Sequence, residues 1–504
     1  MKIFEKLNVC IGIILICSIN SFSQKISIDF RSADSSRGEL ILAEAGGEKI
    51  TVKEFIYGYE FGPSFPKKVK DSKEVYLNYL INEKLLAADG YSRGVDTMPI
   101  VKENLYGIET DLATEELFKD KVLKQVKVSD EEVNAAVRKK LITVELKWLF
   151  APDKDSLRFY TEGLSKGISF DSIFRLQLKD SVFEDQRKWN TDLFDLEQKS
   201  SMIAGLIKNQ KAGSISSPVK GPDGWYIFNI VNIWKNVLPS QSEINEMKEK
   251  SGRVLEKARM DSLSDEYVRK IFVEQNPQIN GKTFDLLRTY LARNEVDPEK
   301  FKEWRIDDKL NSLQLQADSL KKDVSSFVLV EMKEGSYSFK DFIDWLRYRE
   351  QVIKFNETDF NAFSKSVESY VWHMVRDNSL TSRAFAEGYQ NKKLVREQLG
   401  WWKDKIVYAI VRDELTGSAL MDNKKEGFKF ENKPLSDEAN KKLLHKVIAL
   451  RQKYKIKINK EILSEIRVEN ENDPKSVDVY AVKKGGVFPR PAFPSIDILW
   501  QNWQ

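Results

Sequence analysis

The chain of 504 residues has two cysteines, Cys10 and Cys17, and both fall at its start. It also has two histidines, His373 and His445, and neither has a second histidine or a cysteine nearby in the sequence. A disulfide framework, a catalytic thiolate and a zinc site all need residues that this chain lacks. We therefore expect no metal ion and no other cofactor.

An excess of charge of one sign is missing too. The 81 basic and 77 acidic residues leave a formal net charge of +4, and the two signs are interspersed. Nucleic-acid binding gets no support, because it needs a basic patch. Beyond residue 23 no apolar run is long enough to cross a bilayer, so we expect no membrane span in the mature chain. Walker, dinucleotide and nucleophile-elbow motifs are also absent.

The first 23 residues have the pattern of an export signal. Lys2 and Lys6 precede an apolar run from Val9 to Ile16, and small residues lead to Ser23. This run is too short to span a membrane. We expect residues 1–23 to be a signal peptide that is cleaved after Ser23. Ile16 stands where a lipoprotein signal needs a small residue, so Cys17 is not expected to carry a lipid.

A compact α/β unit is predicted in the second quarter of the chain. β-branched and aromatic residues alternate imperfectly over 141–150, which favours a half-buried strand. A helix is expected over 156–166, with Gly167 as the left-handed residue just past its end. Residues 221–224 predict a turn, and Trp225 to Val231 predict a closing strand.

The closing part of this unit resembles the parvulin family of peptidyl-prolyl isomerases, whose pattern is Leu-x-x-Gly-x-x-Ser-x-Pro-Val and then Gly-aromatic-His-Ile. The matching residues are Gly213, Ser216, Pro218, Val219, Gly224, Trp225 and Ile227. The resemblance implies that residues 141–236 form a parvulin-like, FKBP-like α/β domain. Such a domain holds a proline ring in an apolar cup while the X-Pro bond rotates over a barrier of about 18–20 kcal/mol.

Both histidines of the parvulin family are missing. The alignment places them at Lys147 in the first strand and Tyr226 in the last. Lysine only donates hydrogen bonds, so we expect isomerase activity to be weak or lost. The resemblance implies a substrate-binding cup formed by Lys147, Leu149, Phe194, Met202, Trp225 and Tyr226. The alternative is that Trp225 and Tyr226 are ordinary sheet residues of a peptide-binding or spacing module.

Residues 40–140 predict a mostly helical module. A short strand leads into a helix capped by Thr51, with Glu54 at the capping-box position. A helical stripe that is apolar apart from Glu83 follows and ends near Gly90 or Gly94. Further helices are expected over 98–122 and from residue 129.

Two segments of this module resemble SurA- and PpiD-like periplasmic folding factors, namely the Ile-Thr-x-x-Glu-Phe motif at 50–55 and the Leu-Ile-x-x-x-Leu-Leu motif at 80–86. The resemblance implies a chaperone module and a periplasmic location. A long charged helix is predicted within 239–281, and Asn276-Pro277 ends it. In that family a helix at this place returns to the N-terminal module.

The second half of the chain repeats the helical module. Residues 337–343 echo 50–56, and one offset, 388 − 94 = 294, aligns Gly94 with Gly388 and Leu80 with Met374. The sequence Ile458-Asn459 stands where Ile279-Asn280 did. We predict that residues 282–470 are a second helical module without a parvulin-like insert. The alternative is chance similarity between amphipathic helices.

Residues 471–504 form a tail rich in proline and aromatic residues, and its prolines exclude a helix around 489–494. The tail either packs across its own domain or docks on a partner. The fold class predicted for the whole chain is multi-domain and mostly α, with one α/β domain.

Two functions remain open. The first is an exported chaperone or foldase that binds unfolded outer-membrane or secreted clients, including proline-containing polypeptides. The second is a non-catalytic structural subunit of a cell-envelope secretion or assembly complex, with the tail as its docking element.

Overall fold

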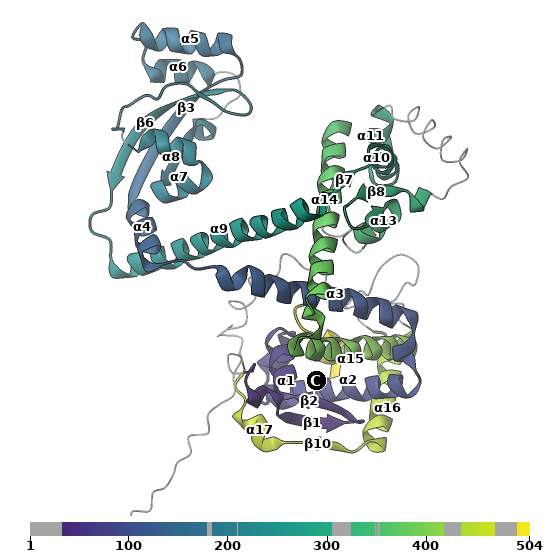
Figure 1. The fold of residues 1–504 in the computed structure, drawn as a ribbon. Coiled ribbons are helices and arrows are strands. Elements are labelled where there is room, and N and C mark those ends of the chain that lie inside the picture. The colour runs from purple at the N-terminus through teal and green to yellow at the C-terminus, as the bar shows by residue number, and fades with distance from the viewer. Residues whose placement is uncertain are drawn as a thin grey trace, which may run out of the picture. The chain divides into compact units, whose positions relative to one another are not determined.

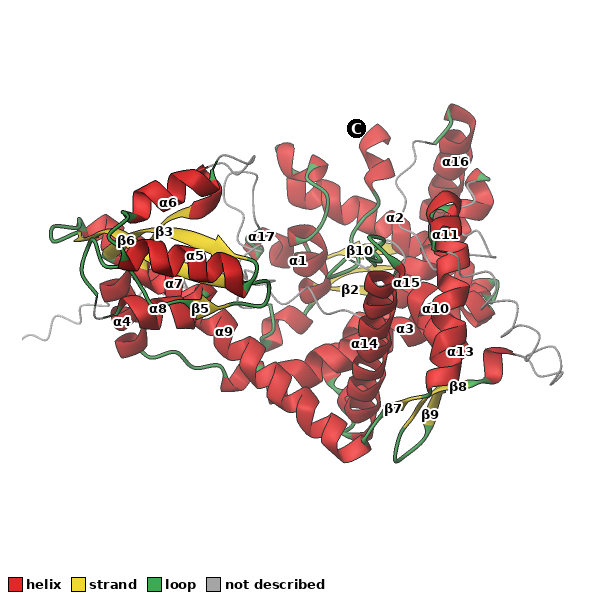
Figure 2. Cartoon of the chain, turned by 90° about the horizontal axis from the view of Figure 1, so that it is seen from above, coloured by secondary structure: helices red, strands yellow, loops and turns green. Residues whose placement is uncertain are grey.

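The structure is a computed structural model that describes residues 33–178, 184–208, 210–304, 324–347, 349, 353–417, 435–468 and 491–503. The expected signal peptide and residues 471–490 of the tail lie outside these ranges. Helices make up most of the described chain, and its strands form three small sheets (Figure 2). The fold is multi-domain and mostly α, as predicted. Within the described ranges, no helix is both long and apolar enough to cross a membrane.

The chain divides into two compact units. Unit 1 combines residues 1–117 with 275–504, and unit 2 is residues 118–274. The division falls earlier than residue 140, where the sequence pattern predicts it. The reason is that α4 (Asp130–Lys140) packs on α7 (Leu193–Lys199) of the α/β domain. Lys140 also pairs with the Asp195 carboxylate at 2.9 Å.

Unit 1 contains two helical modules in which a two-stranded hairpin leads into three helices. The first has β1 (Ile41–Ala45), β2 (Glu48–Thr51), α1 (Val52–Glu60), α2 (Ser72–Ser92) and α3 (Pro99–Lys121). The second has β8 (Val328–Glu331), β9 (Ser336–Ser338), α13 (Phe339–Arg347), α14 (Phe360–Ala386) and α15 (Lys393–Thr416).

The two modules share one fold in detail. Each hairpin has a single register shift, between Ile41 and Ala43 in the first and between Val328 and Val330 in the second. Gly94 (φ 73°) and Gly388 (φ 78°) both take the left-handed backbone that favours glycine, shortly before α3 and α15. The spacing that relates these glycines in the sequence therefore also relates them in the structure.

The modules exchange their closing elements. The strand β7 (Gln278–Ile279) follows the first module but pairs with β8 of the second. The strand β10 (Ile456–Ile458) follows the second module but pairs with β1 of the first. Likewise, α15 and α16 (Asp437–Lys453) pack on α2, as Figure 1 shows.

The expectation that the helix within 239–281 returns to the N-terminal module is therefore wrong for its exit strand. Ile279 pairs with Val330, and Ile458 holds the equivalent place opposite Ala43. Both exit strands end in Ile-Asn, and each asparagine caps a following helix, α10 (Gly281–Glu295) or α17 (Lys460–Glu465). Both exit strands carry the same Ile-Asn pattern, so this local pattern does not decide the pairing.

The core of the first module lies between α2 and α15. Gly90 of α2 allows the close approach, because a Cβ there would lie 2.5 Å from Val407 Cγ1. Trp402 and Tyr408 of α15 are fully buried in the same core as Phe55 of α1. Tail residues from Ala492 to Trp500 also belong to this core, so the described tail packs on its own domain.

Unit 2 is built on an antiparallel sheet with the strand order β4-β3-β6-β5. Its strands are β3 (Ile142–Ala151), β4 (Lys188–Asp192), β5 (Val219–Lys220) and β6 (Trp225–Lys235). Its other helices are α5 (Lys154–Ser165), α6 (Phe170–Gln177), α8 (Ser201–Ile207) and the long α9 (Gln241–Gln275), which is also predicted from the sequence. An apolar core joins the sheet to α5 and α6, and a second core joins it to α7 and α8.

Candidate functional site

Four aromatic residues form a continuous row on the sheet of unit 2. Trp148 of β3 is paired with Phe228 of β6, and Phe150 is paired with Tyr226. Directly paired residues of antiparallel strands point to the same face, and so do alternate residues along one strand. All four rings therefore lie on one face, which we call the aromatic row.

The rings of the aromatic row contact one another in sequence. The ring centroids of Trp148 and Phe228 are 6.4 Å apart, and those of Phe228 and Tyr226 are 6.1 Å apart in a stacked arrangement. Tyr226 and Phe150 follow at 5.2 Å. Phe228 is buried and the other three rings are half-buried. The row is thus continuous and partly open to solvent.

The aromatic row continues the face that α7 and α8 cover. Val144, Leu146 and Ile230 of this face are buried with Leu196 and Ala204 of these two helices. The row begins two residues further along β3, where β4 has also ended, since β4 pairs β3 only as far as Lys147. The face therefore passes from a helix-covered core to a half-exposed apolar surface.

Tyr226 is held by the turn that precedes its strand. Its hydroxyl donates to the Asp223 carboxylate, with oxygen distances of 2.8 and 2.9 Å. Partial burial, followed by the neighbouring Asp223 carboxylate, raises the pKa of the Tyr226 phenol. Tyr226 therefore stays neutral near pH 7 and presents its ring to the row.

Two glycines allow the turn to lie against the row. A Cβ at Gly221 would lie 2.7 Å from the Tyr226 ring, and a Cβ at Gly224 would lie 2.6 Å from the Phe150 ring. The Gly224 Cβ would also lie 2.5 Å from the carbonyl oxygen of Ala151. These close approaches explain the glycine spacing that the sequence shows.

The loop before β5 is fastened to β6 beside the row. The Ser216 amide donates to the Phe228 carbonyl at 2.8 Å, and the Phe228 amide donates to Ser216 Oγ at 2.9 Å. Gly213 has φ 85°, which a residue with a Cβ rarely adopts. Ser216 and Gly213 are two residues of the parvulin-like pattern, and here they position the loop.

Lys147 and Tyr226 do not share a site, which corrects the expectation from the alignment. Lys147 is paired with Asn229, three positions along the ladder from the Tyr226 pair, and an odd separation reverses the face. The Lys147 side chain lies over the Phe174 ring of α6 at 5.6 Å and pairs with Asp171 at 3.3 Å.

The other predicted cup residues are also dispersed. Leu149 is buried under α6, and Trp225, paired with Ala151, belongs to the same face as Leu149. Phe194 is buried in α7, whereas Met202 on α8 is exposed. Of the six predicted residues, only Tyr226 belongs to the aromatic row.

Sequence reasoning missed Trp148, Phe150 and Phe228. The signal that could have found them is the alternation of side chains along β3. Val144 and Leu146 are apolar, and Trp148 and Phe150 continue the same alternate positions, so all four belong to one face. If the first parvulin histidine is aligned with Trp148 instead of Lys147, its position falls on the same face of the sheet as Tyr226.

The aromatic row suits contact with apolar and proline-containing chain. Aromatic faces bury large apolar area and stack on flat groups without needing a defined sequence. The row itself offers no acid, base or nucleophile besides the neutral Tyr226 phenol. In the described part of the chain, no group of three or more His, Cys, Asp or Glu residues could hold a metal ion.

No family model matches this chain, and no curated protein matches it. Among solved structures it is similar to the peptidyl-prolyl isomerase PrsA of Bacillus anthracis, with 14% identity, a TM-score of 0.21, and coverage of 31% of this chain and 69% of that one. It is also similar to a SurA-like chaperone of Campylobacter jejuni, with 16% identity, a TM-score of 0.22, and coverage of 46% and 97%.

A third similar structure is the foldase protein PrsA of Lactococcus lactis, with 13% identity, a TM-score of 0.19, and coverage of 46% of this chain and 93% of that one. These are distant likenesses of fold, and they assign no activity to this chain.

Proposed function

We propose that this protein is an exported, periplasmic chaperone that binds unfolded outer-membrane or secreted polypeptides, and that the aromatic row is a client-binding surface. The observation that carries the proposal is the row itself: three half-exposed rings beside a buried fourth, held by paired strands and a glycine turn. Rigid aromatic surface binds chain at a low cost in side-chain entropy. The sequence resemblance to periplasmic folding factors supports the same reading.

The proposed role is binding rather than efficient catalysis. Positions 147 and 226 hold lysine and tyrosine, and these lie on opposite faces of the sheet. The row therefore supplies an apolar platform for proline and aromatic side chains, without the imidazole pair of the parvulin family. We expect any proline rotation to be weak.

The test is suppression of aggregation of a chemically unfolded model protein by the full chain. The double variant Trp148→Ala with Phe150→Ala removes half of the row, and we expect it to need at least fivefold more protein for the same suppression. The matched control is Phe159→Ala on α5, an aromatic residue of the same unit that is 62% exposed and outside the row. Equal suppression by all three proteins would contradict the proposal.

The alternative is a fixed subunit of an envelope complex that docks through the tail 471–504, of which residues 471–490 lie outside the described ranges. In the described tail, Phe493 and Trp500 are buried in unit 1. Stoichiometric co-purification with one partner, together with no suppression of aggregation, would favour the subunit over the chaperone.

A further inference from the structure

The C-terminal segment 491–503 is seated in the first helical module although about 25 residues of sequence separate it from α17. Its main buried residues are Ala492, Phe493, Ile496, Asp497, Leu499 and Trp500. The Phe493 ring lies 4.5 Å from the Tyr57 ring of α1, and the Trp500 ring stacks on Tyr79 of α2 at 5.6 Å.

Two glycines of the first module make room for this segment. A Cβ at Gly62 would lie 2.2 Å from Ser495 Oγ and 2.4 Å from the Gly58 carbonyl oxygen. A Cβ at Gly58 would lie 2.5 Å from Tyr76 Oη and 3.1 Å from the Pro494 carbonyl oxygen. The second module has large residues at both equivalent places. The offset that aligns the two hairpins, 337 − 50 = 287, puts Trp345 at the place of Gly58 and Arg349 at the place of Gly62.

The second module shows what those large residues do. Trp345 Nε1 and Arg349 Nη2 each donate to the Asp377 carboxylate at 3.1 Å. The offset 377 − 83 = 294 makes Asp377 the equivalent of Glu83 on α2. The second module therefore satisfies its buried acid with residues of its own.

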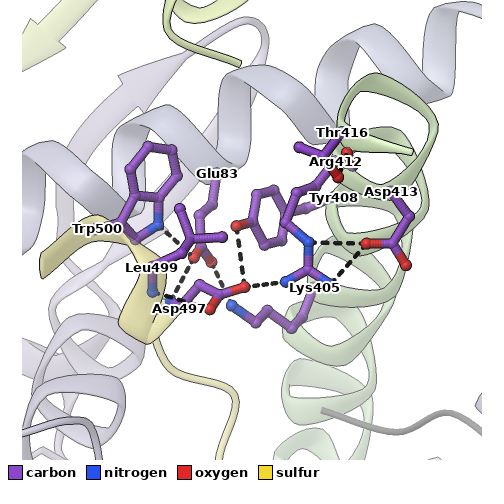
Figure 3. A network of polar contacts seen from close by, with 9 residues as sticks. All are labelled: Glu83, Lys405, Tyr408, Arg412, Asp413, Thr416, Asp497, Leu499 and Trp500. Carbon is purple, nitrogen blue, oxygen red and sulfur yellow. Dashed lines mark hydrogen bonds and ion pairs between the residues drawn. The ribbon is translucent and has the colours of Figure 1, made fainter. Parts of the chain in front are cut away.

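In the first module the tail supplies the missing indole. Trp500 Nε1 donates to Glu83 Oε1 at 2.9 Å, and the Asp497 amide donates to the same oxygen at 2.7 Å (Figure 3). Lys405 of α15 pairs with the other Glu83 oxygen at 2.8 Å. A tryptophan from the tail thus makes the hydrogen bond that Trp345 makes in the second module.

The Asp497 carboxylate fixes the register of the segment. It pairs with the Arg412 guanidinium and accepts from the Tyr408 hydroxyl at 3.3 Å, both on α15 (Figure 3). All of these groups are buried, so removing the carboxylate leaves a buried cation short of a partner. The groove thus binds a segment that has an aromatic residue directly before a proline. An acidic residue follows, and a tryptophan stands three residues after the acidic one.

We propose that the groove over Gly58 and Gly62 is a polypeptide-binding site, that residues 491–503 are its resident ligand, and that an extended segment of another polypeptide with the same chemistry binds there by displacing the tail. In the second module Trp345 and Arg349 stand at the equivalent places and bind the Asp377 carboxylate themselves. This proposal is independent of the aromatic row.

The test uses a fluorescently labelled peptide with the sequence of residues 491–503 and measures its anisotropy on titration with the full chain. Wild type should bind weakly, because its own tail competes at high effective concentration. The Asp497→Ala variant weakens the tail, and we expect it to bind the peptide at least tenfold more tightly. A peptide with alanine at the place of Trp500 should lose most of this affinity.

The matched control fills the groove. Adding Gly58→Trp to Asp497→Ala copies the second module, and it should return peptide binding to the wild-type level. Circular dichroism checks that each variant is folded. If Asp497→Ala does not fold, Trp500→Phe replaces it, since phenylalanine keeps apolar burial but lacks the indole donor.

If the Asp497→Ala variant binds the peptide no more tightly than wild type does, the proposal is wrong. It is also wrong if tight binding persists with Gly58→Trp. A wild-type dimer that the tail variants lack, seen by light scattering, would assign the groove to a second copy of this chain and would also overturn it.

Discussion

Leu80 on α2 and Met374 on α14 occupy equivalent positions of the two modules, and both side chains are buried. The offset of 294 that relates Gly94 to Gly388 relates these residues too. Leu80 lies in a core that the first module does not complete alone, because α2 packs on α15 of the second module.

Truncating either core position should destabilise unit 1. We expect Leu80→Ala and Met374→Ala each to lower the free energy of unfolding by about 2–5 kcal/mol, the usual cost of a cavity in a packed core. Chemical denaturation of the two variants measures this. Met98→Ala, at a position 39% exposed, is the control and should cost less than about 1 kcal/mol. A large loss at one site with none at the other would contradict the equivalence.

Restoring the two family histidines at the aligned positions should not create an isomerase. In the double variant Lys147→His with Tyr226→His, the imidazoles would project from opposite faces of the sheet, as the present side chains do. We expect the proline-rotation rate in a protease-coupled peptide assay to stay within about twofold of wild type, a difference of about 0.4 kcal/mol in barrier. A tenfold increase would show that the two positions cooperate.

The turn beside the aromatic row should not tolerate a side chain at Gly224. A Cβ there would lie 2.5 Å from the Ala151 carbonyl oxygen, which is backbone and cannot move aside cheaply. We expect Gly224→Ala to destabilise unit 2 by roughly 1–3 kcal/mol. Gly205→Ala is the matched control: it lies in α8 with no atom within 4 Å of the added Cβ, and alanine there should gain about 0.5–1 kcal/mol. Thermal melts that rank these variants the other way would refute this account of the turn.

Glu54 should make unit 1 less stable as the pH rises toward neutral. Burial raises the pKa of this carboxyl from 4.5 to about 7, although Lys84 Nζ lies 2.6 Å away. The unfolded chain therefore releases the proton first, and the folded state loses stability between about pH 4.5 and 7. Relative to Glu54→Gln, wild type should lose up to roughly 3 kcal/mol over this range.

Unfolding experiments at pH 5 and pH 8 on both proteins give this difference directly. The control is Glu44→Gln, because Glu44 is only half-buried and its hydrogen bond with Lys457 lowers its pKa, so it is ionised throughout the range. A parallel pH dependence of wild type and Glu54→Gln would contradict the prediction for Glu54.

The sequence alone determined the elements whose signals are local. Gly167 (φ 86°) follows α5, Thr51 caps α1, and the long helix ends at Gln275 before Asn276, as predicted. The equivalence of Gly94 and Gly388 was also readable, because a left-handed position leaves its mark on a single residue. Caps, turns and periodicity act over a few residues, so a linear pattern is enough to find them.

Only the tertiary structure decided the pairings between distant segments. The Glu54 amide donates to Thr51 Oγ1 at 3.1 Å, as its capping position predicts, but its carboxylate turns to Lys84 instead of closing the box. The face that Lys147 occupies depends on strand register. The exchange of β7 and β10, and the hydrogen bond from Trp500 to Glu83, join segments that lie far apart in the sequence. Long-range packing decides these pairings, so they cannot be predicted from a local pattern of residues.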